Sequence, residues 1–559
     1  MTVIRERLRQ GRRWLSRGMW ERARREFEGA LDAAVGDRER AQAAEGAAEA
    51  AWWLDDDARV SERYEQAYRA YRAAGDLVGA ARSAAWLGNG ALQLRGEDAV
   101  AQDWFRRAGR LLEGAPRGRE RALLTLFEGM AARQRGDGET AIERAEEVVS
   151  AARGLGSSDL EVQGMALSGV ARVDRGDVGE GMRLLDEAAA VALAGQTHEV
   201  GAVWMPGCYL VQGCVQARDW ERAAQWSGRV MDLCRRLDLG SPFARCRTHY
   251  GTALLWQGRW PEAEEELTGA VRALSGIRPL FAAEARAQLG ELRRRQGRRT
   301  EAGELFRAAR TTPDGRLGLA ELCLDEGDAG GAFDHARALL DGLPAQASLE
   351  RCRALELLAR AGARRSAGVP ESEHARLLDA ARELGGLAGM VGTDAVHASA
   401  LWAAGLMRLR VLQESTGTEH AVATLRRATL LFERAGDAYN AARVRLDLAE
   451  ALTARDRPGT AEEEAAAARE TLVRLGGVTD ARRAVRLLAR VRHDRASALT
   501  TRQREILALV ALGMTNKEIA RRLALSEHTV KRHIANILVR LGLPSRTAAV
   551  AHASRAGLL

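Results

Sequence analysis

The sequence predicts an all-α protein, with a long array of paired helices over residues 1–480 and a small four-helix domain at the C-terminus. Three observations lead to this prediction. A pattern of small and large residues recurs with a period near forty, alanine and arginine are over-used, and the last sixty residues contain closely spaced helix start and stop signals. At 559 residues the chain is too long for one hydrophobic core, which also favours an array.

The recurring unit has a glycine in one helix, a turn that contains glycine, and the pattern Ala-x3-large-x2-Ala in a second helix. Its clearest copy reads Gly251, Leu254, Gly258, Trp260, Ala263, Leu267 and Ala270. Further copies begin at Gly11, Gly129, Gly169 and Gly290, and weaker ones end on Ala108, Ala428 and Ala468. Small residues let two helices approach closely, and the large residue fills the groove between them. The turn glycine adopts the left-handed conformation that ends the first helix, so we interpret these residues as core.

This unit resembles the tetratricopeptide repeat. The resemblance implies a tetratricopeptide-like right-handed α-solenoid, with about eleven or twelve helical pairs in residues 1–480. The pattern is hard to follow between Leu340 and Val396, where residues 367–370, Ala-Gly-Val-Pro, predict a loop.

The segment from Trp204 to Tyr209 departs from the repeat. It places Pro206, a helix breaker, and two aromatic residues where the first helix of a unit is expected. Either the helix kinks there and lines a ligand pocket, or the segment is a long loop between helices. We favour the loop, and we retain Trp204 and Tyr209 as candidate ligand-binding residues under the first interpretation.

Positive charge is concentrated at the C-terminal end of the chain. Residues 499–559 carry ten Lys or Arg against three acidic residues, and residues 481–498 carry six Arg and one Asp, so that residues 1–480 hold a net −4 of the total of +8. A basic module on a nearly neutral body is typical of proteins that bind polyanions. The Arg-rich stretch 481–495 either continues the last helix of the array or forms a flexible linker.

Residues 496–559 carry the signals of a helix-turn-helix domain. Thr500 with Gln503, and Thr515 with Glu518, form capping boxes. Gly513 and Gly542 stand where helices end, Ser526 is the expected N-cap of the third helix, and Ser545 starts a fourth helix from about Arg546 to Ala556. The turn between Leu523 and Ser526 is too short for antiparallel packing, so the second and third helices are expected to cross.

The third helix divides into two faces. Val530, Ile534, Ile537 and Leu541 form an apolar stripe, whereas His528, Lys531, Arg532, Ala535 and Val539 fall on the opposite side. A basic stripe with small residues fits deep into the major groove of DNA, where Lys and Arg read guanine edges. Thr529 near the start of this helix, and Asn516 and Lys517 on the preceding helix, are placed to bind phosphates.

These residues resemble the signature of the LuxR/NarL family over about sixty residues. The match includes Gly513, the run from Asn516 to Ala520, Ser526, Thr529 to Lys531, His533, Leu541 with Gly542, and Arg546. The resemblance implies that Lys531, Arg532 and Ala535 face the bases and that the fourth helix is a dimer contact. Gln503 replaces the usual Glu and Arg540 a common Lys. Sigma-factor region 4 starts similarly, but His533 and the lack of a sigma core argue against it. The forty-residue period is similar to that of the solenoids in maltose-regulator-type LuxR proteins.

Several classes of function find no support in the sequence. The chain has two lysines, Lys517 and Lys531, both in the C-terminal module, so no P-loop is expected upstream and we expect no ATPase or other enzyme activity. The six cysteines show no metal-ligand spacing, and neither a signal peptide nor an apolar window of about 20 residues occurs. We therefore expect a cytoplasmic protein without metal or cofactor.

Together these observations predict a bacterial transcription regulator that binds double-stranded DNA as a homodimer. We expect RNA polymerase as a further partner, favour an activator over a repressor, and expect an effector or partner protein on the solenoid and no membrane. A change in solenoid curvature that reorients the DNA-binding module is one hypothesis for signalling. The alternative is a helical-repeat scaffold whose C-terminal domain binds protein.

Overall fold

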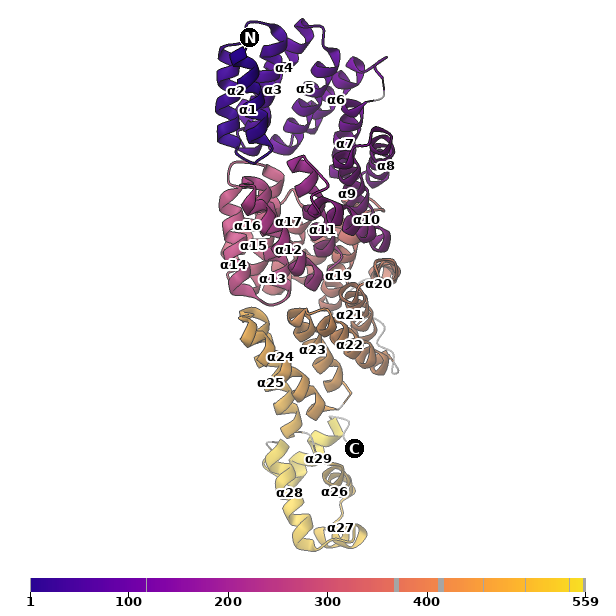
Figure 1. Ribbon diagram of the computed structural model, residues 1–559. Helices are drawn as coiled ribbons and strands as arrows, with labels where there is room; N and C mark the ends of the chain where they lie inside the picture. The colour runs from indigo at the N-terminus through magenta and orange to yellow at the C-terminus, as the bar shows by residue number, and fades with distance from the viewer. Residues whose placement is uncertain are drawn as a thin grey trace. The chain divides into compact units, whose positions relative to one another are not determined.

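The computed structural model describes residues 2–116, 118–365, 371–410, 417–455, 457–497, 499–541 and 543–555. Within these residues every regular element is a helix, as the sequence predicts (Figure 1). The chain divides into two compact units: residues 1–444 with 471–479, and residues 445–470 with 480–559. None of the described helices has the length and apolar character needed to cross a membrane.

The helices of the array follow one another as pairs joined by short turns. The N-terminal ones are α1 (Thr2–Leu15), α2 (Trp20–Asp32), α3 (Asp37–Trp53), α4 (Asp57–Ala73), α5 (Leu77–Gly90), the π-helical η1 (Ala91–Arg95), α6 (Asp98–Leu111), α7 (Arg119–Gln134), α8 (Gly138–Leu155), α9 (Ser158–Asp174) and α10 (Val178–Leu193). The middle ones are α11 (Val200–Gln216), α12 (Trp220–Arg236), α13 (Gly240–Trp256), α14 (Trp260–Ala273), α15 (Pro279–Arg295), α16 (Arg299–Ala308), α17 (Pro313–Glu326) and α18 (Ala329–Gly342). The remaining ones are α19 (Ser348–Arg364), α20 (Glu371–Val391), α21 (Asp394–Arg410), α22 (Gly417–Arg434), α23 (Ala438–Thr453), α24 (Pro458–Leu475) and α25 (Val478–Ser497).

Four further helices follow in the described part of the chain: α26 (Thr501–Ala511), α27 (Asn516–Arg522), α28 (Glu527–Leu541) and α29 (Arg546–Arg555). The Arg-rich stretch 481–495 lies within α25. Gly542 and Ala556, to which the sequence assigned helix ends, and the loop expected at residues 367–370 lie outside the described residues.

Close packing of glycine against a large side chain joins the two helices in several of the pairs. A Cβ atom on Gly251 of α13 would lie 2.7 Å from Cγ of Leu267 on α14, and one on Gly88 of α5 would lie 2.4 Å from Cε1 of Phe105 on α6. Neither position has room for a side chain, because Leu267 and Phe105 are themselves fully buried. The core that the repeat pattern predicts is therefore confirmed.

The turn glycines adopt the conformation expected of them. Gly18, Gly136, Gly258 and Gly297 each have φ between 70° and 82° and follow the first helix of a pair. An L-residue with a side chain is strained at such angles, which explains why the sequence repeats glycine at this point of the unit.

The repeat continues through the region where its sequence pattern fades. Helices α19 and α20 occupy residues 348–391, and a Cβ atom on Gly362 of α19 would lie 2.4 Å from Cδ2 of Leu377 on α20. The small-against-large contact is thus preserved without the full Ala-x3-large-x2-Ala pattern, which made this pair hard to recognise.

The loop favoured for residues 204–209 is wrong. These residues lie inside α11, which runs through Pro206 without ending. Proline removes one helical hydrogen bond, but the surrounding Met205, Gly207 and Cys208 are buried, and a Cβ atom on Gly207 would lie 2.9 Å from Cγ2 of Val230 on α12. We infer that close packing of this apolar stretch outweighs the local cost of the proline.

The array of the first unit coils back on itself, so that turns distant in sequence touch. Trp20 Nε1 donates to the carbonyl of Leu237, 217 residues later, at 3.2 Å. Ser348 Oγ donates to the carbonyl of Arg175 at 2.7 Å, and Thr393 Oγ1 donates to that of Ala217 at 2.8 Å. In each case a turn within one pair meets a residue of a much later helix pair, so successive coils of the solenoid are in contact.

We predict that Gly318→Ala destabilises the array, because the new methyl group would lie 2.1 Å from Cε1 of Phe306. Overpacking of this kind costs about 1–3 kcal/mol, and the midpoint of thermal unfolding followed by circular dichroism should fall. Adding Phe306→Leu should recover part of the loss, since it makes room at the same contact.

The matched control is Gly109→Ala on α6, where nothing lies within 4 Å of the added atom. This change should leave the midpoint unchanged or raise it, because alanine favours helix over glycine by roughly 1 kcal/mol. Equal destabilisation at Gly109 and Gly318 would contradict the packing argument.

Candidate nucleic-acid interface

The four C-terminal helices enclose a small core of their own. Its buried members come from α26, α27, α28, α29 and the residue before α26; they are Leu499, Ile506, Leu507, Leu509, Val510, Ile519, Ala520, Val530, Ile537 and Ala549. Ile534 and Leu541 pack partly buried against them. The predicted apolar stripe of α28 therefore faces inward, which leaves the opposite face of this helix for solvent or a partner.

Side-chain caps fix where each of these helices begins. Thr500 with Gln503 and Thr515 with Glu518 form both predicted capping boxes. Ser526 Oγ accepts from the backbone N–H of Thr529 at 3.0 Å, which confirms Ser526 as the cap of α28. The backbone N–H of Thr515 stabilises the Glu518 carboxylate and lowers its pKa. The helix boundaries are therefore set locally, by residues that sequence analysis could identify.

A tight turn joins α27 to α28. Ala524 has φ of 52°, and the backbone N–H of Leu525 donates to the carbonyl of Ala520 at 2.9 Å. Arg502 of α26 donates to the carbonyl of Leu523. The connection is as short as the sequence predicts, and it is tied to the first helix of the domain.

The predicted base-reading residues lie on the exposed face of α28. His528, Lys531, Arg532 and Ala535 are all exposed, and Val539 on the same side is 81% exposed. Their exposure follows from the helical period, because the residues between them, Val530 and Ile537, are buried. The face combines two cations with small or apolar side chains.

The cations of this face are not neutralised within the protein. Among the described residues no acidic group lies within 4 Å of the charged nitrogens of Lys517, Lys531 or Arg532. Many arginines of the solenoid differ: Arg82, for example, binds Glu45 at 2.6 Å and Glu120 at 3.0 Å. An exposed cation without an internal partner is available to a phosphate or a base.

The predicted phosphate-binding residues are held at helix starts. Thr529 stands at the start of α28, with its hydroxyl 2.7 Å from that of Ser526, and exposed Lys517 stands at the start of α27. Asn516 Oδ1 accepts from Arg546 at 2.9 Å, while Arg546 also donates to the carbonyl of Met514. Arg546 therefore orients Asn516 with its amide nitrogen left as the donor, a positioning role that sequence analysis did not assign.

Gln503, which stands where the LuxR/NarL signature usually has Glu, finds its hydrogen-bond partners within the domain. Gln503 Oε1 accepts from the backbone N–H of Thr500 at 2.9 Å and from Arg540 Nη1 at 3.0 Å. One neutral oxygen thus caps α26 and links it to α28. The cap is preserved, as the sequence predicts.

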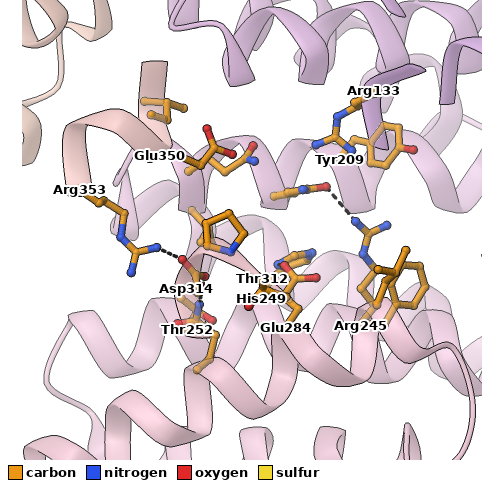
Figure 2. Close-up of a pocket in the computed structure, with 18 of the residues that line it drawn as sticks. Arg133, Tyr209, Arg245, His249, Thr252, Glu284, Thr312, Asp314, Glu350 and Arg353 are labelled. Atoms are coloured by element: carbon orange, nitrogen blue, oxygen red, sulfur yellow. Dashed lines mark hydrogen bonds and ion pairs between the residues drawn. The ribbon is translucent and has the colours of Figure 1, made fainter. Parts of the chain in front are cut away.

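A second candidate site is a cavity of about 380 Å³ inside the first unit (Figure 2). Residues of η1, α7, α11, α13, α15 and α19, and of the start of α17, line it. Tyr209, one of the two candidate ligand residues, is part of this wall, and its ring lies 5.3 Å from the guanidinium carbon of Arg133 and 5.9 Å from that of Arg245. Trp204 instead packs against the apolar cluster that contains Cys208 and is not part of the cavity wall.

Burial shifts the pKa of several ionisable groups in the cavity wall. Burial raises the pKa of Glu284, and it raises the pKa of Glu350 to about 7, with the Asp174 carboxylate adding to the shift. Burial also lowers the pKa of His249, whose Nδ1 lies 3.6 Å from Glu284. Sequence analysis missed these residues, since single charges within apolar helices carried no motif.

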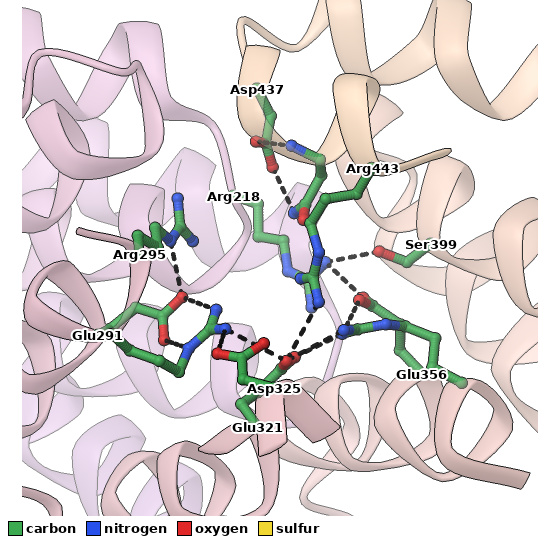
Figure 3. A network of polar contacts seen from close by, with 12 residues as sticks. Arg218, Glu291, Arg295, Glu321, Asp325, Glu356, Ser399, Asp437 and Arg443 are labelled. Atoms are coloured by element: carbon green, nitrogen blue, oxygen red, sulfur yellow. Dashed lines mark hydrogen bonds and ion pairs between the residues drawn. The ribbon is translucent and has the colours of Figure 1, made fainter. Parts of the chain in front are cut away.

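Beside the cavity, a buried network of charges joins several helices (Figure 3). Arg218, in the turn before α12, donates to Ser399 of α21 at 2.7 Å and to Glu356 of α19 at 3.3 Å. Glu321 of α17 accepts from Arg360 of α19 at 3.0 Å and from Arg443 of α23 at 3.3 Å. The network therefore connects turns and helices that are far apart in sequence.

The C-terminal part of the chain matches known regulators. Residues 497–553 match the sequence model described as "Bacterial regulatory proteins, luxR family". The transcriptional regulatory protein LiaR of Bacillus subtilis is 45% identical over 75 residues, which cover 12% of this chain and 36% of LiaR. The activator DevR/DosR of Mycobacterium tuberculosis is 40% identical over 80 residues (13% and 37%), and the nitrate/nitrite regulator NarL of Escherichia coli 45% over 69 residues (11% and 32%). The chain thus spans about a third of the length of these relatives.

Two solved structures align with most of the chain at low identity and low TM-score. A chain of the Cut9-Hcn1 complex of APC/C aligns over 86% of this chain and 95% of its own length, at 14% identity and a TM-score of 0.36. A Rap protein complexed with competence and sporulation factor aligns over 77% and 98%, at 12% identity and a TM-score of 0.41. On the match to the family model, residues 497–553 form a helix-turn-helix domain of the LuxR family.

Proposed function

We propose that this chain is a cytoplasmic transcription regulator that places α28 in the major groove of an operator. The observation that carries the proposal is the exposed face of α28, where Lys531 and Arg532 have no acidic partner among the described residues and Ala535 leaves space for close approach. In this arrangement Lys531 and Arg532 donate to guanine edges, with His528 and Ala535 beside them. Family membership of the domain supports the same reading.

The phosphate contacts in this proposal come from the starts of α27 and α28. Lys517 offers a positive charge, and Thr529 and the Asn516 amide offer hydrogen-bond donors next to helix N-termini, where the helix dipole favours anions. Such contacts set the orientation of the domain on DNA without reading sequence. Arg546 contributes indirectly, because its hydrogen bond at 2.9 Å fixes Asn516.

We further propose that the solenoid is the regulatory input and that the protein acts as an activator together with RNA polymerase. A helical array of this length is far more than a small DNA-binding domain needs for its own stability. Its internal cavity offers a place for an effector. A scaffold whose C-terminal domain binds protein is the competing function, and a mobility-shift assay with duplex DNA separates the two.

We predict that Lys531→Ala and Arg532→Ala each weaken operator binding by roughly 1–3 kcal/mol and relax specificity at one base pair. Lys517→Ala serves as the comparison, because loss of a phosphate contact should weaken operator and random DNA alike and reduce the salt dependence of binding. Fluorescence anisotropy with operator and random duplexes measures both effects. Unchanged affinity of the Lys531/Arg532 double variant would contradict the groove assignment.

We predict that two copies bind each operator, with half-sites about one helical turn apart. A single small module buries too little surface for tight specific binding, so a second copy is needed for affinity. Sedimentation of the protein with excess operator should give a stoichiometry of two chains per duplex. One chain per duplex at saturation would exclude dimeric binding.

We predict that removal of residues 1–480 leaves DNA binding intact but abolishes the response of promoter output to growth conditions. The remaining residues contain the whole family match at 497–553 and its core. Anisotropy tests binding by the fragment, and a reporter gene tests its output. A fragment that still responds to conditions would show that the solenoid is not the input.

A further inference from the structure

In the described part of the chain, the wall of the first unit's cavity holds one guanidinium group and two carboxyl groups that form no ion pair with an Arg, Lys, Asp or Glu side chain within 4 Å. Resting on the proposed function of the solenoid as the regulatory input, we propose that this cavity binds a small zwitterion with an apolar body, an amino acid or a dipeptide. In this arrangement the carboxylate of the ligand meets Arg245, and its ammonium group meets Glu284 and Glu350.

Among the described arginines of the cavity wall, Arg245 is the one that forms no ion pair. Three others are paired: Arg133 with Asp174, Arg218 with Glu356, and Arg353 with Asp314; Figure 2 shows the last pair. Arg245 is only 9% exposed, and in the described part of the chain no carboxylate lies within 4 Å of its guanidinium nitrogens.

The hydrogen bonds of Arg245 do not replace an anion. Its Nη2 donates to the neutral amide oxygen of Gln212 at 3.1 Å, and its Nε has no hydrogen-bond partner. Its guanidinium carbon lies 4.4 Å from the ring centre of Phe281. A buried cation is costly unless an opposite charge accompanies it, and a ligand carboxylate supplies that charge.

Among the described residues, two carboxyl groups of the wall have no Arg or Lys nitrogen within ion-pair distance. Glu284 has only His249 within ion-pair distance, at 3.6 Å, and burial favours the neutral form of this histidine by lowering its pKa. Glu350 Oε2 is buried and has no hydrogen-bond partner. A ligand ammonium group has several N–H donors, which supply hydrogen bonds to the carboxyl groups of Glu284 and Glu350.

The remaining wall suits an apolar body. Tyr209, Trp220, Trp256, Leu280, Phe281 and Leu349 contribute apolar surface between the polar groups. The volume of about 380 Å³ lies in the range of roughly 300–1,000 Å³ that is usual for small-molecule sites. Opposite charges in one apolar cavity favour a zwitterion over a simple anion or cation, because a singly charged ligand leaves the other charge of the wall unpaired.

The test uses the full-length protein and scanning fluorimetry with common L-amino acids and hydrophobic L-dipeptides, followed by calorimetric titration of every probe that raises the melting temperature. At least one probe should bind. Its N-acetylated and C-amidated forms should bind at least roughly tenfold more weakly, since each lacks one charge. Comparing amino acids with dipeptides identifies the size of the ligand.

Glu284→Gln and Arg245→Met should each weaken binding of the same probe, the first with little change in shape. Glu304→Gln is the matched control. Glu304 is exposed on α16, so this change should leave binding unchanged. If no probe binds, or if the acetylated and amidated forms bind as well as the parent compound, the zwitterion proposal is wrong. Operator binding without probe is measured on the same samples, so failure of the ligand proposal is distinguishable from failure of the DNA-binding proposal.

Discussion

The fold of the first unit depends on ion pairs between buried arginines and buried carboxylates. Glu321 is surrounded by Arg294, Arg360 and Arg443, and although burial opposes its ionisation, these cations hold its pKa well below the usual range. Arg294 and Arg295 are 1% exposed and both bind Glu291. Removal of one member of such a network leaves a buried charge uncompensated, at a cost of about 3–5 kcal/mol. The helices that carry these side chains are therefore held in the arrangement that keeps the charges paired.

This constraint bears on how a regulatory signal can arise in the solenoid. A change in curvature that separated the contacting coils would have to pull Arg218 from Ser399 and Glu356, and Arg443 from Glu321. Coupling between a ligand site and a distant site is typically about 1–3 kcal/mol, less than the cost of opening even one of these buried pairs. The curvature hypothesis drawn from the sequence therefore requires these buried pairs to break, and it stays a prediction.

Sequence analysis predicted the C-terminal domain in detail because its determinants are local. Capping boxes such as Thr515 with Glu518, the cap at Ser526 and the helical period of Val530 and Ile537 all lie within a few residues of the structure they specify. The helix pairs of the array were also predictable, since glycine and its large partner recur at fixed spacing. The contacts between coils were not, because single pairs such as Trp20 with Leu237 leave no periodic signal. For the same reason α11 was mistaken for a loop: Pro206 is a local signal, whereas its packing is not.

Both candidate sites contain cations that form no ion pair with a described acidic residue. Many charged side chains of the solenoid are paired within the protein, as Arg133 is with Asp174. Residues 1–480 also carry a net charge of −4, which does not favour polyanions. Lys531 and Arg532 on α28, and Arg245 in the cavity, have no acidic partner in the described residues. On an exposed helix an unmatched cation costs little and is available to DNA, whereas in a cavity it is costly until an anion arrives. We therefore expect DNA binding to weaken steeply with salt. Ligand binding at the buried Arg245 should depend on salt far less, because salt screens buried charges less than exposed ones.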